Sequence, residues 1–328
     1  MSIQVDIFDY LKSTRNDSLL VAELGDLLAI STDSVYRRLR GNTDLNLDEL
    51  SKICNHFNIS IDSFICKNPS KVDFQPVWHN NLEFNYVEYL RNLKTEMNIL
   101  SDIPNCRLFY SSKDLPLFYN LLIPELSAFK GFFWEKSVAQ LPHLRNAKFS
   151  VENIDEESVS MAEDILTSYN NINTSELWND GVLTSTLNQI QFYNDSGFFS
   201  NDNDFNILIE KLQLLIDHCE EQADSGVKFK LGDQPDSTLK NYFLYHSDIL
   251  IGDNTIILDL NSQFSVYKAH NIIDNMVTHH ENFCKRTLQM YENFLSTATL
   301  ISSTNQRERI RFFNRLREKV EVVSNLTV

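Results

Sequence analysis

Hydrophobic residues recur every three to four positions through most of the first 65 residues, which is the spacing of one face of an α-helix. Residues 3–12 place four such side chains on one face, namely Ile3, Ile7, Phe8 and Leu11. Residues 19–28 repeat the pattern with Leu20, Leu24, Leu27 and Leu28. Asp17 or Ser18 is suited to cap this second helix. The short segment from Ala29 to Ser31 then predicts a tight turn before a third helix.

The third predicted helix carries an unusual concentration of arginine. Ser31 or Thr32 is suited to its N-cap, because a hydroxyl there accepts a hydrogen bond from a free backbone N–H. At 100° per residue, Val35 and Leu39 define the buried side. Asp33, Arg37 and Arg40 then lie roughly opposite, and the flanks carry Ser34, Tyr36 and Arg38. Two helices joined by so short a turn form a helix-turn-helix pattern.

A fourth helix is predicted after Gly41 and a polar loop. Asn46 and Glu49 have the spacing of a reciprocal helix-start motif. The apolar face of this helix consists of Leu47, Leu50, Ile53 and Phe57. Asn58 suits the helix exit, and Ser60 suits the cap of a last short turn. That turn is expected to fold back on the core through Ile61, Phe64 and Ile65.

The segment from residue 24 to residue 65 resembles the Cro and phage-repressor (XRE) family of helix-turn-helix regulators. The resemblance lies in the helix order, the glycine after the third helix, the "LxxL" of the fourth helix and the ending "NISIDSF". It implies a λ-repressor-like all-α fold whose third helix enters the major groove of double-stranded DNA, usually in a homodimer. The DNA-binding residues would then be Thr32, Asp33, Ser34, Tyr36, Arg37, Arg38 and Arg40. Gly25, Ala29 and Arg38 differ from the family's usual residues, and Asp33 would repel phosphate unless it accepts a hydrogen bond from a cytosine amino group.

Residues 68–82 contain proline, asparagine and serine and are interpreted as a linker between a domain of residues 1–67 and a domain of residues 83–328. The larger domain opens with a 4-3-4-3 spacing of apolar residues, Tyr86, Leu90, Leu93, Met97 and Leu100. This seam fits either internal packing, which we favour, or a dimer helix. Residues 106–112 are β-prone. Residues 113–138 predict a buried helix whose aromatic cluster forms core or, as an alternative, lines a pocket for an apolar effector.

Residues 155–172, 174–195 and 202–223 predict further helices, and the period then changes. Residues 227–232, 242–248 and 254–269 alternate or run apolar, with turn chemistry at 252–254, which predicts an antiparallel β-meander. Helical spacing returns at 283–298 and 305–323. The expected fold class is therefore mainly α with a smaller β component: an all-α helix-turn-helix domain followed by a helix-rich α+β domain.

The charge of the chain is strongly acidic, with a formal net charge of −16. Such a surface repels phosphate and argues against broad, non-specific contact with nucleic acid, although it permits one small reading surface. The predicted helix at 306–319 is a second basic patch. It could contact DNA, bind an acidic surface of its own protein or be solvated, and we favour the last two together.

The sequence predicts a cytoplasmic protein, because no apolar window approaches the length of a membrane span and the N-terminus does not resemble a signal peptide. Its five cysteines, Cys54, Cys66, Cys106, Cys219 and Cys284, are dispersed, so we expect reduced and mostly buried thiols. No zinc knuckle is indicated.

Motifs of enzyme chemistry are missing from the sequence. It contains no P-loop, dinucleotide fingerprint, nucleophile elbow or HExxH motif. His280 and Cys284 share one predicted helix face, but two ligands are too few for a zinc site. Asp202 and Asp204 lie in a loop without the glycine and terminal glutamate of an EF-hand. We therefore expect no enzymatic activity, no metal and no cofactor.

The function predicted from the sequence is sequence-specific transcriptional regulation by a homodimer that binds a two-fold DNA operator. Residues 1–70 are not net basic, so a single helix-turn-helix unit would bind weakly. The larger domain would mediate dimerisation and could sense a small-molecule effector. Two alternatives are an adaptor that uses the N-terminal domain to bind protein, and an enzyme with an unrecognised site in the larger domain.

Overall fold

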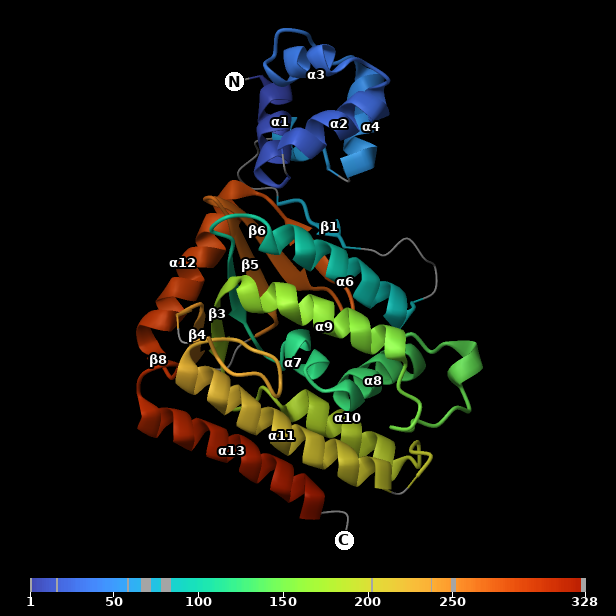
Figure 1. Ribbon diagram of the computed structural model, residues 1–328, viewed down its shortest axis with the longest axis vertical. Helices are drawn as coiled ribbons and strands as arrows, with labels where there is room; N and C mark the ends of the chain where they lie inside the picture. Colours follow the sequence, from blue (N-terminus) through green and yellow to red (C-terminus); the bar gives the residue numbers. More distant parts are fainter. Residues whose placement is uncertain are drawn as a thin grey trace.

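The computed structural model describes residues 2–15, 17–57, 59–65, 72–77, 84–201, 203–236, 238–248 and 252–325. It is 57% helical and 13% strand, which confirms the predicted fold class. A small all-helical unit sits at one end of a larger unit built around a mixed sheet (Figure 1). We call the described residues up to 65 the head and those from 72 onward the body. Among the described residues, no helix combines the length and the apolar character needed to cross a membrane.

The head consists of five helices, α1 (Ile3–Ser13), α2 (Asp17–Leu28), α3 (Thr32–Leu39), α4 (Leu47–Phe57) and α5 (Asp62–Ile65). Their apolar faces form a separate core that includes Phe8, Leu24, Val35 and Ile53. The predicted helices are confirmed, with local exceptions. Ile3, Leu47 and Ile65 are exposed rather than packed. Asp17 and Ser18 lie inside α2 and do not precede it, and Asn58 lies outside the described residues.

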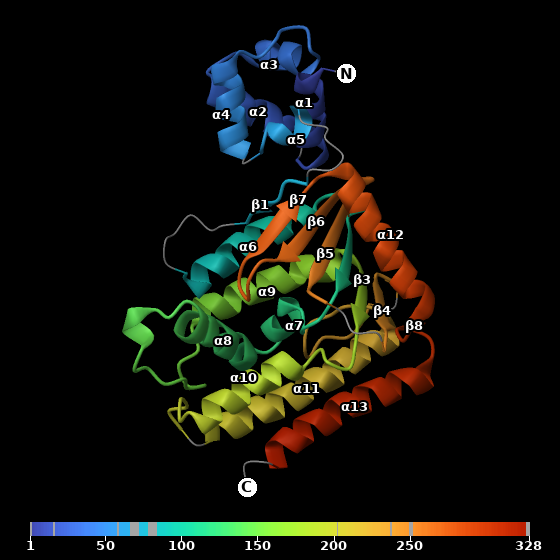
Figure 2. The same cartoon turned by 180° about the vertical axis from the view of Figure 1, so that it is seen from behind.

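The body contains one mixed sheet with the strand order β1-β7-β6-β5-β2-β3-β4-β8. The strands are β1 (Gln75–Pro76), β2 (Arg107–Ser111), β3 (Asn173–Trp178), β4 (Tyr242–His246), β5 (Thr255–Leu260), β6 (Gln263–Ala269), β7 (Asn275–Thr278) and β8 (Thr299–Leu300). β2, β3 and β4 run parallel to their neighbours in this group, and the other pairings are antiparallel. Figure 2 shows the β5–β7 side of the sheet below the head.

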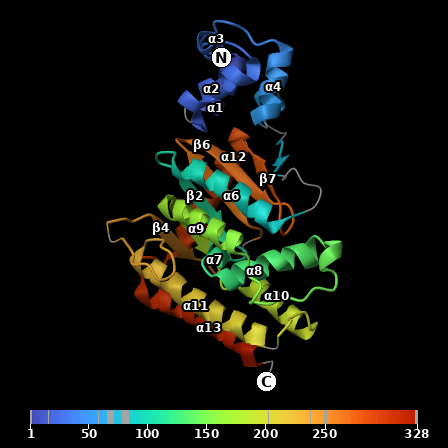
Figure 3. The ribbon, with the colours of Figure 1, turned by 45° about the vertical axis from the view of Figure 1, so that its right-hand side comes forward.

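Alternation along the strands directs side chains to two different helical layers. On one face, Ile257 and Val266 join Cys284 and Tyr291 of α12 (Glu281–Thr297) in a small core. The other face contributes to the main core together with α6 (Tyr86–Ser101) and α9 (Glu156–Asn171). Figure 3 shows α6 lying across this face. The α6 seam packs inside the body, with Tyr86, Leu90 and Met97 buried, which agrees with the favoured interpretation.

Further helices extend the main core away from the sheet. They are α7 (Leu117–Leu121), α8 (Pro124–Phe133), α10 (Thr184–Asp195), α11 (Asn203–Ser225) and α13 (Gln306–Asn325). α13 packs along α11 at the end of the body farthest from the head (Figure 1). The prediction of a single helix for residues 113–138 is wrong. Pro124 begins a new helix, and a π-helical turn covers Trp134–Val138.

Two predictions in the middle of the chain are wrong. Residues 174–195 were expected to be helical, but β3 occupies the first part and the helix begins only at Thr184. β3 lies between β2 and β4 and is buried on both faces, so the alternation typical of a surface strand is absent. Residues 227–232 form no strand. Lys228 in this segment is buried, and its Nζ donates to the carbonyl oxygens of Tyr169 and Ile172 at 2.7 and 2.8 Å.

The predicted meander and linker are each partly wrong. β5, β6 and β7 do form an antiparallel meander, but β4 lies on the far side of β2 and β3 and is parallel to β3. Much of the predicted linker, residues 68–82, lies outside the described residues. Its described part is not free chain. β1 extends the sheet by pairing with β7, and the Val77 N–H donates to the Asn275 carbonyl oxygen at 2.8 Å.

Candidate nucleic-acid interface

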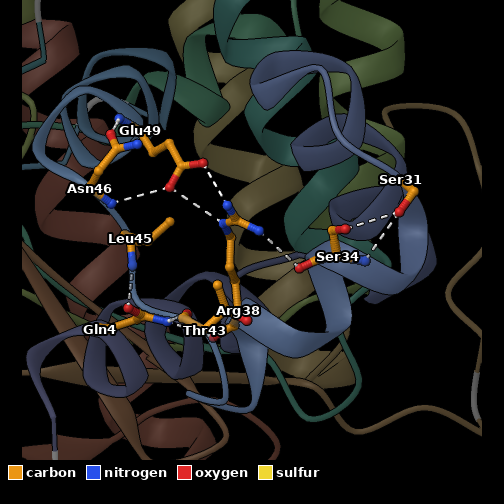
Figure 4. Close-up of polar contacts among 8 residues, drawn as sticks. All are labelled: Gln4, Ser31, Ser34, Arg38, Thr43, Leu45, Asn46 and Glu49. Carbon is orange, nitrogen blue, oxygen red and sulfur yellow. Dashed lines mark hydrogen bonds and ion pairs between the residues drawn. The ribbon is translucent and has the colours of Figure 1, made fainter.

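The third helix of the head, α3, begins at a hydroxyl cap. Ser31 is the N-cap, as predicted, and its Oγ accepts from the backbone N–H of Ser34 at 3.4 Å. The two serine hydroxyls are also hydrogen-bonded to each other at 3.0 Å (Figure 4). Ser34, one of the predicted DNA-binding residues, is therefore half-buried at the start of the helix. Its hydroxyl stabilises the cap in addition to facing the surface.

The tight turn before α3 places Ala29 in the left-handed region, with φ +53°. This is the position at which the resembled family usually has glycine. Gly25 lies in α2, where a Cβ would meet the Ile30 carbonyl oxygen at 3.4 Å, an ordinary van der Waals contact. The turn therefore forms with alanine at position 29, and Gly25 of α2 packs near the residue that follows it, Ile30.

The two sides of α3 are sharply different. Val35 and Leu39 are buried in the head core. The residues that are exposed in and directly after the helix are Thr32, Asp33, Tyr36, Arg37 and Arg40. α3 lies at the end of the head farthest from the body, as all three ribbon views show. The exposed side chains therefore occupy an end of the molecule that the body does not cover.

The exposed arginines of α3 have only weak partners. Arg37 Nη2 lies 2.9 Å from Asp33 Oδ2, and both side chains are exposed. The Arg40 guanidinium lies 5.9 Å from the centre of the Tyr36 ring. An exposed i,i+4 pair is worth about 0.3–0.5 kcal/mol, so Arg37 can leave Asp33 at small cost. Asp33 reduces the local positive charge in the meantime.

Arg38 differs from the other two arginines because it is held inside the head. Its Nη2 donates to Glu49 Oε1 at 2.7 Å and its Nε to Glu49 Oε2 at 3.4 Å. A third guanidinium nitrogen, Nη1, lies 3.4 Å from the Ser34 carbonyl oxygen. Figure 4 shows the Arg38 side chain directed towards the start of α4. The structure thus gives Arg38 a role that the sequence did not reveal, as a link between α3 and α4.

Glu49 also completes the predicted helix-start motif of α4. The Glu49 N–H donates to Asn46 Oδ1 at 2.8 Å, and the Asn46 N–H donates to Glu49 Oε2 at 3.1 Å. Partial burial acts to raise the pKa of Glu49, but hydrogen bonds from Arg38 and Asn46 outweigh it, and the pKa is lowered. One carboxylate therefore caps α4 and anchors α3.

Gln4 fixes the loop that follows α3, and sequence reasoning missed it. Its Nε2 donates to the carbonyl oxygens of Arg38 and Thr43, both at 2.8 Å, and its Oε1 accepts from the Leu45 N–H at 2.8 Å. These bonds attach the end of α3 to α1 (Figure 4). The partners lie 34 to 41 positions away in the chain, so no local pattern could indicate them.

The head also contacts the body through α1. Tyr10 Oη is hydrogen-bonded to His279 Nε2 at 3.0 Å, and the two rings meet edge to face. His279 follows β7, and its Nδ1 is hydrogen-bonded to Ser265 Oγ of β6 at 2.7 Å. Ser13 donates to Gln263 at the start of β6. The head therefore contacts β6 and the residue that directly follows β7.

Three arginines of the second basic patch are paired with acidic side chains of the body. Arg317 of α13 donates to Asp217 and Glu220 of α11, at 2.7 and 2.6 Å. Arg309 is buried and pairs with Asp224, also of α11. Arg315 pairs with Asp180 at 2.9 Å. This helix thus binds an acidic surface of its own protein, one of the interpretations that we favoured.

The other candidate clusters of the sequence can be examined only where their residues are described. No group of three or more His, Cys, Asp or Glu side chains is placed to hold a metal within the part of the chain that the structure describes. Cys284 is buried and its Sγ contacts the Thr278 carbonyl oxygen at 3.4 Å. Asp202 lies outside the described residues, and Asp204 is buried, where it accepts from the Asn201 N–H at 3.1 Å. Cys66 also lies outside the described residues, and Cys106 and Cys219 are buried.

Comparison with known proteins gives one family match. The model of the BetR domain matches residues 9–95, a range that runs from α1 of the head into α6 of the body. No curated protein and no solved structure matches the chain.

Proposed function

We propose that this protein is a cytoplasmic transcriptional regulator that binds specific double-stranded DNA as a homodimer, with α3 as the helix that enters the major groove. The observation that carries the proposal is the exposed face of α3, with Arg37 and Arg40 on a rigidly held helix at an uncovered end of the molecule. Helices of this kind read bases with residues near one end while the rest of the unit contacts the backbone.

The proposed division of labour among the arginines follows from their contacts. Arg37 and Arg40 reach base edges or phosphates, because their present partners are exposed and weak. Thr32, Asp33 and Tyr36 line the same surface. Arg38 keeps α3 and α4 at a fixed angle through Glu49 and is not a primary base contact. Phosphate contacts would fix the register, and base contacts would supply specificity.

A second candidate function, an adaptor that binds another protein, has one observation in its favour. The head exposes large apolar side chains that a DNA contact does not need, with Leu19 69% and Leu47 84% exposed. Exposed apolar groups are common on protein surfaces, which makes this the weaker candidate.

Selection from a random double-stranded DNA library with the full-length protein tests the proposal. We expect enrichment of a sequence with two-fold symmetry and half-sites about one helical turn apart, close to 34 Å. Analytical ultracentrifugation on the selected DNA should show two chains per duplex. Absence of any enriched sequence, combined with capture of a protein partner that Leu47→Ser abolishes, would favour the adaptor.

A further inference from the structure

A cavity of about 150 Å³ lies between α6 and the sheet of the body. Its walls are mostly apolar and come from α6, α7, β2 and β5–β7, with Leu93, Met97, Leu108 and Phe118 among them. A cavity of about this volume can accommodate a single six-membered ring. Mostly apolar cavities with a few convergent polar groups are typical of small-molecule sites.

One charged side chain, Glu96 of α6, lines this cavity. Among the residues that the structure describes, none forms an ion pair with Glu96 or donates a hydrogen bond to it. The side chain of Glu96 is exposed to solvent, yet the surrounding groups also desolvate its carboxyl and raise its pKa. A side chain that faces a concave space can be exposed to solvent and also partly desolvated by the walls around it. This desolvation disfavours the ionised carboxylate, and a cation beside it would favour the ionised form.

Aromatic side chains lie beside Glu96 in the same walls. Tyr89, Tyr110 and Tyr267 line the cavity. Burial raises the pKa of Tyr267, and the charge of Glu96 raises it further, so the two groups are close enough to interact and the tyrosine stays neutral. Aromatic faces next to a carboxylate stabilise an organic cation through its charge as well as its apolar body.

The cavity also touches the segment that connects the body to the head. Val77, directly after β1, and Asn275 of β7 both line it, and they are joined by the 2.8 Å backbone hydrogen bond. Tyr267 belongs to β6, whose Ser265 holds the His279 that contacts Tyr10 of the head. A ligand here would therefore contact two of the strands that position the head.

We propose that this cavity binds a small organic cation, a primary amine carrying one ring or a short apolar chain, with its ammonium group on Glu96 and its apolar part against the tyrosines. Occupancy stabilises the β1–β7 pairing at Val77. Cation binding itself does not depend on the DNA-binding function. Regulation of DNA binding by the bound cation, however, rests on that proposed function.

Isothermal titration calorimetry of the full-length protein tests the binding with three probes of one shape: phenethylamine, 2-phenylethanol and phenylacetate. We expect saturable binding of phenethylamine, with affinity at least tenfold above that for either of the other two. Glu96→Gln should reduce the affinity for phenethylamine at least tenfold and leave 2-phenylethanol unchanged. Glu163→Gln, at an exposed glutamate of α9, is the matched control and should change neither. Equal binding of all three probes to the wild type, no saturable binding of phenethylamine, or equal affinity of Glu96→Gln would overturn the proposal.

Hydrogen–deuterium exchange tests the effect of the ligand on the β1–β7 pairing. This test is independent of the calorimetric test of ligand binding and of any DNA binding. Saturating phenethylamine should slow exchange of the Val77 amide several-fold in the wild type and not in Glu96→Gln. Calorimetric binding with unchanged exchange at Val77 would overturn the link to β1. Neither measurement uses DNA, so failure of the proposed DNA-binding function leaves both results interpretable.

Discussion

Arg38 of α3 and Glu49 of α4 form an ion pair at 2.7 Å, with each side chain 15% exposed. The pair connects the helix that we propose to read DNA with the helix that supports it. Because Glu49 also accepts from the Asn46 N–H, the guanidinium is attached to a carboxylate that is itself fixed. One of three neighbouring arginines thus stabilises the head, and the other two remain exposed for binding.

Arg38→Met should lower the free energy of unfolding of the head by about 1.5–3 kcal/mol, the size of a lost hydrogen bond to a charged group. Methionine keeps the apolar contacts of the stem, so the change reports the guanidinium. Urea denaturation followed by hydrogen exchange in α3 and α4 measures it. Arg37→Met, which breaks only the exposed pair with Asp33, is the control and should shift stability by less than about 0.5 kcal/mol. Equal destabilisation by the two variants would contradict the assignment.

The pH dependence of the head should follow Glu49. The pKa of this carboxyl is lower in the folded state than its ordinary value of 4.5, so its contribution to stability is complete above pH 4.5 and is lost as pH falls below that value. Glu49→Gln should therefore flatten the acid limb of the stability curve of the head. The expectation can be checked by measuring, at several values between pH 6 and pH 3, the urea concentration at which the α3 amides lose half of their protection from exchange. A wild-type curve parallel to that of Glu49→Gln would argue against it.

Arg40→Ala and Arg37→Ala should weaken binding to the selected operator by about 1–3 kcal/mol each where the arginine reaches a guanine. Because both side chains are exposed, neither change should unfold the head. Fluorescence anisotropy at fixed salt measures the affinity. Arg307→Ala, an exposed arginine on α13 at the opposite end of the molecule, is the matched control and should bind like the wild type. Unchanged affinity for both α3 variants would reject α3 as the reading helix.

Ala29→Gly should stabilise the head by about 1 kcal/mol, because Ala29 has φ +53° and only glycine adopts this conformation without a Cβ penalty. Gly41→Ala is the opposite change: Gly41 has φ +74°, and a Cβ would lie 3.3 Å from Val5 Cγ2. That variant should destabilise the head by about 1–2 kcal/mol. Chemical denaturation of the two variants measures whether each change raises or lowers the stability of the head. A loss of stability in Ala29→Gly would show that the turn does not retain this backbone conformation in solution.

The local features of the candidate interface could be predicted from the sequence, whereas its long-range contacts could not. The Ser31 cap, the Asn46–Glu49 motif and the inward side of α3 depend on residues within four positions of one another. The Arg38–Glu49 pair spans 11 positions and the Gln4 bonds span 34 to 41, so they require the helices to be packed first. For the same reason the exposure of Arg37 and Arg40 was predicted correctly, while the contact of Arg38 with Glu49 was not.

In the body, too, local features could be predicted from the sequence and long-range contacts could not. Surface helices such as α11 were predicted because one face is apolar and the other polar. β3 was missed because it is buried on both faces and lacks the alternation of a surface strand, and its middle residue, Glu176, is a buried carboxylate. The structure satisfies Glu176 with the Tyr119 hydroxyl at 3.0 Å and the Trp178 indole N–H at 2.8 Å. Tyr119 comes from α7, so a buried polar site of this kind is visible only after the chain has folded.

The buried His279, which contacts Tyr10 of the head, should make the stability of the protein depend on pH. Burial raises the pKa of Tyr10 to about 12 and lowers the pKa of His279 to about 4, so both are neutral near pH 7. In the unfolded chain a histidine takes up a proton near pH 6.5. The folded state therefore gains stability from the neutral ring above pH 6.5, and this contribution is lost as pH falls from 6.5 towards 4.

We accordingly expect the unfolding free energy of the wild type to fall more steeply between pH 7 and pH 5 than that of His279→Gln. His143→Gln, at an exposed histidine, should keep the wild-type slope. Tyr10→Phe removes the hydrogen bond but leaves the ring contact, so it should cost about 1 kcal/mol at pH 7 and preserve the steep slope, because His279 stays buried. Urea denaturation at several pH values, followed at both the head and the body by hydrogen exchange, measures these differences. A His279→Gln slope equal to that of the wild type would show that protonation of this ring does not cause the loss of stability between pH 7 and pH 5.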